Sequence, residues 1–374
     1  MRRVYLEDLQ PGMIIARTII GRDGRSLLTE NTRLTENYIS KLDALGITSI
    51  YIKDGLADNE IPEIISQKVL AQVSSSLTLS IKSLTTRNVL QIDSLKKGVS
   101  LLIEDIMSNQ HLLIQLEDIH SSDDYLFFHS INVAVFSIMV GITLGYPENR
   151  LMDMGLGALV HDIGMTMIDP GIVKKQGPLD PRELEQLKGH TEIGFNILRT
   201  YREVSTMSAH IAYQHHERIS GTGYPRQLEG RQIIEFAKIV AVADTFDALI
   251  SDRPYRKGYS SAEAVTVLKK LANDYFDPEV VEAMVSNIAV YPAGSILALN
   301  TGHLAVVTGV TRSNWDRPVI HIITDEKGYL INNPIQVDLK KTNNMIIARR
   351  LSPEEVVQVK SDLHNRSISG IKAQ

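Results

Sequence analysis

The sequence predicts a mainly helical protein with a small α/β module before the helices and a small β module after them. Apolar residues recur at helical spacing through most of residues 59–288. The first 55 or so residues and residues 291–351 instead contain short runs rich in β-branched side chains, separated by glycine turns. The chain has 374 residues and is 43% hydrophobic, so it can bury two or three cores.

Residues 1–57 form the first predicted module. Residues 13–20 and 26–28 read as strands, with a turn at Asp23-Gly24 between them. Thr35 is placed to cap a helix that ends near Gly46, and residues 47–52 read as a last strand.

Residues 58–118 lack the alternation of strands and read as connecting helices with one apolar stripe. The stripe could serve formation of a homodimer, or it could pack on the next domain. Residues 119–290 form the predicted main domain. Its helices are expected over residues 126–144, 150–162, 181–201, 205–216, 233–251, 260–271 and 278–288.

Residues 291–351 form the β module, with short strands over 296–299, 304–310, 319–324 and 335–338. The polar tail, 352–374, begins with a short helical pattern.

The composition narrows the classes of function. Net charge is −5 with both signs mixed throughout, and no basic block indicates binding of duplex nucleic acid. With no cysteine, disulfides and thiolate metal sites are excluded, which suits a cytoplasmic location. The most apolar run, residues 131–146, is only about 16 residues long, short of the roughly 18 that indicate a membrane span. We therefore expect no membrane span.

One set of histidines and aspartates in the main domain points to chemistry. Taken singly, each has an ordinary explanation, such as a hydrogen-bonded core histidine. Two of the aspartates, however, lie in apolar runs, where an unpaired carboxylate is costly to bury and a metal cation removes that cost. Imidazole and carboxylate suit Fe, Mn, Co or Zn. The set comprises His129, His161, Asp162, His190, His215, His216 and Asp244.

The pair His161-Asp162, the run His215-His216-Glu217 and the loop Gly223-Tyr224-Pro225 together resemble the HD-GYP family, over roughly residues 118–290. These are HD-superfamily phosphodiesterases that degrade the second messenger cyclic di-GMP. The resemblance implies an all-helical HD-type catalytic domain in which the seven residues above are the metal ligands. It further implies two divalent ions, Fe or Mn, with His161 and Asp162 central to catalysis and Asp162 as the bridging carboxylate.

Three positions depart from the family pattern. Tyr125 stands where members with a third metal have glutamate, so we expect two metals. Met165 replaces the lysine of His-Asp-Ile-Gly-Lys, which is thought to help bind phosphate, and Ser220 replaces an aspartate before the Gly-Tyr-Pro loop. No metal ligand is lost.

Substrate contacts are expected from charged and aromatic groups around this set. Arg253 and Arg256 resemble family substrate contacts and offer planar forks to phosphate. Weaker candidates, since a surface charge is usually just solvated, are Lys174, Lys175 and Arg218. Asp247 could meet a guanine edge, orient a ligand, or simply be solvated. Tyr224 could position its loop or contact the substrate.

The resulting hypothesis is a phosphodiesterase that cuts cyclic di-GMP to linear pGpG, with a further cut to GMP left open. In a two-metal site the cations activate water for attack on phosphorus, and the ribose 3′ oxygen leaves. Three alternatives remain: another cyclic dinucleotide such as cyclic GMP-AMP, a catalytically weak sensor that signals through the terminal modules, and a different HD-superfamily phosphohydrolase.

Overall fold

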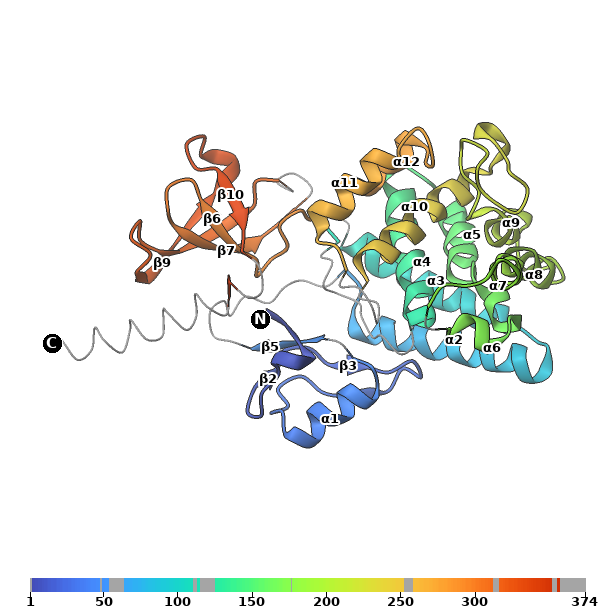
Figure 1. Cartoon of the computed structure of the whole chain (residues 1–374), viewed down its shortest axis with the longest axis horizontal. Coiled ribbons are helices and arrows are strands. Elements are labelled where there is room, and N and C mark those ends of the chain that lie inside the picture. Colours follow the sequence, from blue (N-terminus) through green and yellow to red (C-terminus); the bar gives the residue numbers. More distant parts are fainter. Residues whose placement is uncertain are drawn as a thin grey trace.

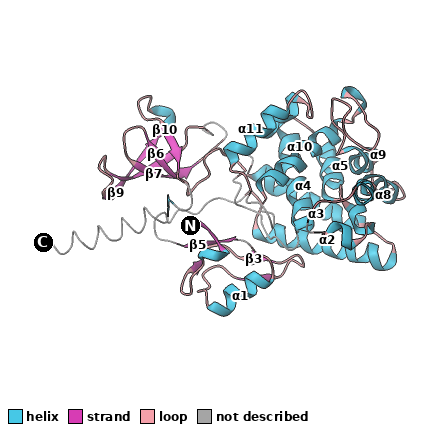
Figure 2. Cartoon of the chain, viewed as in Figure 1, coloured by secondary structure: helices cyan, strands magenta, loops and turns pink. Residues whose placement is uncertain are grey.

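The computed structural model describes residues 2–47, 49–53, 64–109, 113–114, 125–175, 177–251, 258–311, 316–351 and 355–356, with the side chains of residues 2, 3, 125, 126 and 332 excepted. The predicted tail lies outside these residues, apart from 355–356. Figure 1 shows a helical domain with two small strand-containing modules beside it. Coloured by secondary structure, the strands lie in those modules alone (Figure 2). The expected fold class is confirmed.

The N-terminal module is a three-stranded antiparallel sheet with a hairpin and one helix. The sheet has the order β1 (Arg2–Tyr5), β5 (Ser49–Lys53), β2 (Ile14–Ile15). The hairpin joins β3 (Ile19–Ile20) to β4 (Ser26–Leu28), and α1 (Glu36–Ala44) is capped by Thr35. A single strand over 13–20 was therefore a wrong prediction. The chain leaves the sheet after Ile15, and Ile19–Ile20 pair instead across the turn at Gly21–Gly24.

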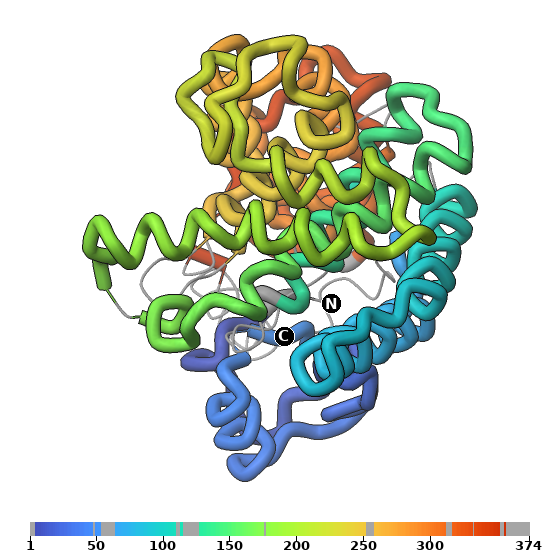
Figure 3. The backbone as a smooth tube through the Cα atoms, turned by 90° about the vertical axis from the view of Figure 1, so that its right-hand side faces the viewer, coloured from blue at the N-terminus to red at the C-terminus, as the bar shows by residue number. Residues whose placement is uncertain are grey.

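The connecting segment forms two long helices, α2 (Gln67–Arg87) and α3 (Ile92–Ser108), which pack on each other. Their apolar stripe is buried in the core of the helical domain, as at Val73, Leu95 and Leu102. Packing on the next domain thus accounts for the stripe, and a homodimer through these helices stays a prediction. Figure 3 shows the pair along one side of the domain, next to the N-terminal module.

The helical domain is built around α4 (Tyr125–Thr143), which is buried from Phe127 to Gly141 and packs on α5, α10 and α12. The other elements are α5 (Glu148–Leu159), α6 (Pro170–Val173), α7 (Pro181–Lys188), α8 (His190–Leu198), α9 (Thr206–Gln214), α10 (Glu235–Ile250), α11 (Ser261–Leu271) and α12 (Pro278–Val285), with short 3₁₀ turns η2 (Ile163–Met167) and η3 (Gly230–Gln232).

Several of the predicted helices end earlier than expected, among them those over 205–216 and 278–288, which stop at Gln214 and Val285. The helix expected over 150–162 stops at Leu159, and the one expected over 181–201 is broken at Gly189 into α7 and α8. These breaks matter for the site because His161, Asp162 and His190 lie directly at them.

The β module is one antiparallel sheet in the order β10-β6-β7-β8-β9, formed by β6 (Ile296–Leu299), β7 (Leu304–Gly309), β8 (Val319–Thr324), β9 (Leu330–Asp338) and β10 (Ile347–Arg350). Leu113, from ahead of the helical domain, joins its core, and Ile114 bridges to Ile288. Within the described residues, none of the helices combines the length and apolarity that a membrane crossing needs.

Candidate metal centre

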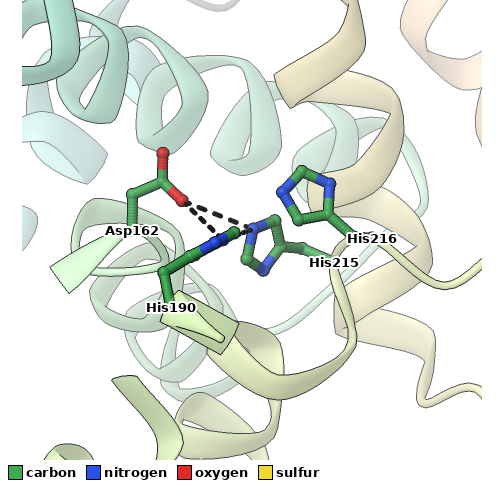
Figure 4. A group of neighbouring side chains, drawn as sticks. All are labelled: Asp162, His190, His215 and His216. Atoms are coloured by element: carbon green, nitrogen blue, oxygen red, sulfur yellow. Dashed lines mark hydrogen bonds and ion pairs between the residues drawn. The ribbon is translucent and has the colours of Figure 1, made fainter. Parts of the chain in front are cut away.

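The seven predicted ligands converge in the helical domain, although they come from five separate places in the chain. His129 is in α4 and Asp244 is in α10, whereas the other five lie at helix ends: just past α5, at the start of α8 and just past α9. Their ligand atoms form two groups, each with its atoms within 4.8 Å of one another. One group is Asp162, His190, His215 and His216 (Figure 4), and the other is His129, His161 and Asp244.

Asp162 joins the two groups. Its Oδ1 lies 3.3 Å from His190 Nε2 and 3.5 Å from His215 Nε2, as the dashed lines in Figure 4 mark. Its Oδ2 lies 3.5 Å from His161 Nε2 and 4.0 Å from His129 Nε2. Each carboxylate oxygen therefore faces one group, which is the arrangement of a bridging ligand.

Asp244 spans the groups in a similar way. Its Oδ1 lies 3.2 Å from His129 Nε2, and its Oδ2 lies 4.0 Å from His216 Nδ1. Both carboxylates, 12% and 14% exposed, therefore face imidazoles.

Hydrogen bonds to backbone carbonyls fix three of the imidazoles. Nδ1 of His161, His190 and His215 lies 2.8, 2.6 and 3.1 Å from the carbonyl oxygens of Ala158, Leu187 and Ile211, respectively. A carbonyl only accepts, so Nδ1 carries the proton and the neutral ring has its lone pair on Nε2. Those Nε2 atoms point at Asp162 and at one another, with His190 and His215 Nε2 only 3.4 Å apart.

His129 is held by a carboxylate instead. Its Nδ1 donates to Asp247 Oδ2 at 2.7 Å, and Asn132 Nδ2 donates to Asp247 Oδ1 at 2.7 Å. Asp247 is fully buried. The predicted substrate contact through Asp247 is therefore wrong, because its carboxylate faces α4 inside the core, where a guanine cannot reach it. The geometry agrees with the alternative prediction, that Asp247 orients a metal ligand, here His129.

Asn132 was missed from the sequence. The available signal was spacing: Asn132 follows His129 by three residues and Asp247 follows Asp244 by three, so each pair shares a helix face.

The electrostatics of the cluster suit a cation. Burial lowers the pKa of His161 to about 4 and holds that of His216 well below its usual range. Burial opposes ionisation of Asp162, but His161, His190 and His215 hold its pKa far below normal, and Asp162 in turn raises the pKa of His190. Among the described residues, buried His161 Nε2 and Asp162 Oδ1 have no hydrogen-bond partner. Lone pairs thus converge without protons between them, which a divalent metal resolves.

The loop that follows His216 is fastened to the site. The Glu217 carboxylate, 2% exposed, accepts from the backbone N–H groups of Arg226 at 2.8 Å and Leu228 at 3.0 Å. The Tyr224 ring stacks on His216, with ring centres 4.6 Å apart. Gly223 is required because a Cβ there would lie 2.4 Å from the backbone nitrogen of Arg218.

The remaining residues singled out in the sequence lie partly outside the described residues and partly around the site. Arg253 and Arg256 lie outside the described residues, as does the side chain of Tyr125. Met165 is partly buried in η2. Arg218 is also partly buried and donates to the carbonyl oxygens of His215 at 3.2 Å and Glu217 at 3.1 Å, so it braces the ligand segment.

Comparison with known proteins agrees with this geometry. Residues 103–280 match the HD domain model, and residues 296–359 match the model of a KOW domain associated with HD domains. A cyclic di-GMP phosphodiesterase of Pseudomonas aeruginosa is 36% identical over 202 residues, 54% of this chain and 49% of that protein. A cyclic di-GMP phosphodiesterase of Thermotoga maritima is 40% identical over 158 residues, 42% and 43% of the two chains.

A 3′3′-cGAMP-specific phosphodiesterase of Vibrio cholerae is 30% identical over 174 residues, 46% of this chain and 38% of that protein. The chain spans about half the length of the curated relatives it matches. Among solved structures, an HDG"Y"P protein from Bdellovibrio bacteriovorus shares the fold, with a TM-score of 0.52 and 17% identity over 76% of this chain and 98% of that one.

The HD-domain match covers the helices that carry all seven side chains, and the Gly-Tyr-Pro loop is intact beside His216. Residues 103–280 therefore match the HD domain, and the intact Gly-Tyr-Pro loop makes this part of the chain similar to the HD-GYP type of HD-domain protein.

Proposed function

We propose that this protein is a metal-dependent phosphodiesterase that hydrolyses cyclic di-GMP to linear pGpG. The observation that carries the proposal is the convergence of imidazole and carboxylate lone pairs in two groups that share Asp162. The curated relatives described above support cyclic di-GMP as the substrate. The cytoplasmic location expected from the composition stays a prediction.

Two divalent ions, Fe or Mn, fit the two groups of ligands. The first would be held by Asp162, His190, His215 and His216, and the second by His129, His161 and Asp244, with Asp162 shared. When bound, such a pair supplies an activated water and neutralises phosphate charge. Imidazole with carboxylate suits either metal, so the choice between Fe and Mn is left to metal analysis.

The chain's own residues then have separate tasks. Backbone carbonyls and Asp247 hold the imidazoles so that their lone pairs face the metals. Burial, with Asp162 and Asp244 adding to it, raises the pKa of Tyr224 well above its usual range, so its phenol stays protonated and can donate to a phosphate or leaving oxygen at the site. Arg253 and Arg256 remain the predicted phosphate clamps.

The direct test is turnover. Purified protein, loaded anaerobically with Fe or Mn, is incubated with cyclic di-GMP, and pGpG and GMP are followed by chromatography. We expect pGpG, and we expect the double variant His161→Ala/Asp162→Ala to lose metal and activity together. Turnover retained by that variant, or hydrolysis of mononucleotides alone, would contradict the proposal.

A second candidate is a sensor that binds the dinucleotide without cutting it. It is favoured by Met165, which puts a neutral side chain where the family has a lysine. Tight binding of cyclic di-GMP to the metal-loaded protein without product would support it. Parallel assays with cyclic GMP-AMP are needed because some relatives are specific for that dinucleotide.

A further inference from the structure

We propose that Lys188 binds the second phosphate of the cyclic dinucleotide, the one not held at the metal centre, and so selects for a two-phosphate substrate. The inference rests on the proposed function. It assigns a contact to a residue that lies outside both groups of metal ligands.

The backbone of Lys188 is fixed relative to the centre. Lys188 is the last residue of α7, and only Gly189 separates it from His190, the first residue of α8. The other end of α7 is anchored by Asp180, which forms a reciprocal capping box with Glu183. Lys188 therefore cannot move far without moving a metal ligand.

The side chain of Lys188 contacts the Tyr224 ring, which in turn stacks on the ligand His216. Its Nζ is 5.4 Å from the centre of the Tyr224 ring, within the range of a cation–π contact. Tyr224 stacks on His216 at 4.6 Å, and His216 meets His190 edge to face at 5.1 Å. Lys188 is thus linked to His190 both through the chain and through the rings of Tyr224 and His216. Its ammonium group therefore lies beside the first group of ligands and not among the ligand atoms.

Lys188 has no acidic partner among the described residues. Across the part of the chain that the structure describes, it makes no ion pair, whereas Lys175 pairs with Glu183 at 2.7 Å and Lys238 pairs with Asp277 at 3.0 Å. Its side chain is partly buried. A partly desolvated ammonium without a carboxylate is suited to bind an anion.

A cyclic dinucleotide has one phosphodiester for the metal centre and a second for Lys188. Its macrocycle carries two phosphodiesters on opposite sides. With one phosphodiester at the metals, the other would bind the Lys188 ammonium group beside the Tyr224 ring. A diester with a single phosphate has no second phosphate for Lys188 to bind.

The test compares Lys188→Met with the wild type, both loaded with Mn, on cyclic di-GMP and on bis(p-nitrophenyl) phosphate, a diester with one phosphate. Loss of a charged hydrogen bond should raise KM for cyclic di-GMP by about 10-fold or more. The loss on the single-phosphate diester should be much smaller, and metal content should not change. Lys188→Arg should recover most of the affinity for cyclic di-GMP. The control Lys269→Met removes an exposed lysine that is already paired with Glu282, and it should behave as wild type.

Each other result counts against the inference. If the wild type cleaves cyclic di-GMP and Lys188→Met has the same KM, only the role of Lys188 fails. Equal losses on both substrates, or loss of metal, would assign Lys188 a structural role and overturn the inference. If the wild type cleaves the single-phosphate diester but neither binds nor cleaves cyclic dinucleotides, the proposed function fails, and the role of Lys188 fails with it.

Discussion

At the level of single residues, the imidazoles of the centre differ in what holds their outer nitrogen. His161, His190 and His215 donate to backbone carbonyls, whereas His129 donates to the buried carboxylate of Asp247. A carboxylate partner makes an imidazole a stronger donor to metal than a carbonyl does. The group of His129, His161 and Asp244 reaches four ligands only by sharing Asp162 with the other group, and the extra basicity of His129 strengthens it.

Replacing Asp247 with asparagine should therefore weaken metal binding without unfolding the protein. The amide keeps the shape but removes the charge, and loss of such a partner typically lowers metal affinity about 10- to 100-fold. We expect one of two ions to be lost first, which can be measured as metal content against chelator concentration. Asp153→Asn, on α5 away from the centre, is the matched control. Equal metal retention by both variants would contradict the role of Asp247.

The sequence was sufficient for the ligand candidates but not for their supports. Histidine and aspartate in apolar runs are unusual enough to be noticed, and the Gly-Tyr-Pro loop narrows the family. Asp247 and Asn132 belong to no such recognisable motif. Spacing places each on the same helix face as a candidate ligand, but only the packing of α4 on α10 makes the two faces meet. The clamp by Glu217 depends on backbone N–H groups nine and eleven residues away, which no periodicity reveals.

At the level of elements, ending a helix is what brings adjacent ligands together. Consecutive residues on a continuing helix point about 100° apart, so His161-Asp162 and His215-His216 could not both face one centre from mid-helix. The structure ends α5 at Leu159 and α9 at Gln214, and both pairs follow these ends. The periodicity in the sequence continues through these points, so the breaks were not predicted.

Gly164 allows the segment after Asp162 to pack closely on the start of α8. A Cβ there would lie 2.0 Å from the carbonyl oxygen of His190 and 2.7 Å from the backbone nitrogen of Gly194. Gly164→Ala must therefore push η2 away from α8 and separate Asp162 from His190. We expect a loss of stability of about 1–3 kcal/mol in urea denaturation, together with loss of metal.

The control for this change is Gly98→Ala in the interior of α3. A Cβ there would meet Val73 at an ordinary 3.5 Å. Alanine should be neutral, or stabilising by about 0.5–1 kcal/mol through helix propensity. If Gly164→Ala matched this control, the close contact would not be holding the segment after Asp162 against α8.

The loop after His216 offers a second test. Glu217→Gln replaces one accepting oxygen with an NH₂ group, so one of the two backbone N–H donors loses its partner at a cost of about 1–3 kcal/mol. Amide hydrogen exchange over residues 221–228 should become faster. The exposed Glu192→Gln serves as control. Unchanged exchange would show that the loop is held by the Tyr224–His216 stack instead.

At the level of the whole molecule, both terminal modules touch segments that lead into the centre. Thr78 of α2 donates to the carbonyl oxygen of Arg22 at 2.6 Å, and Leu113, just ahead of the helical domain, is part of the β-module core. Either module could therefore pass a signal to the helices. The centre itself couples metal to the fold of the domain, because its ligands come from α4, α8, α10 and the ends of α5 and α9.

Removing metal should consequently lower the thermal stability of the helical domain. Without a cation, buried lone pairs of Asp162, His190 and His215 face one another at 3.3–3.5 Å. A metal that binds only the folded state adds about 2.7 kcal/mol per site at a hundred times its Kd, which shifts Tm by several degrees for a domain of this size. Calorimetry of chelated protein, before and after Mn is added back, measures the shift. His161→Ala/Asp162→Ala should melt at the same temperature with or without Mn, whereas Asp153→Asn should keep the full shift. If the Tm of the wild type changes neither with chelator nor with added Mn, the convergent side chains do not bind the ion.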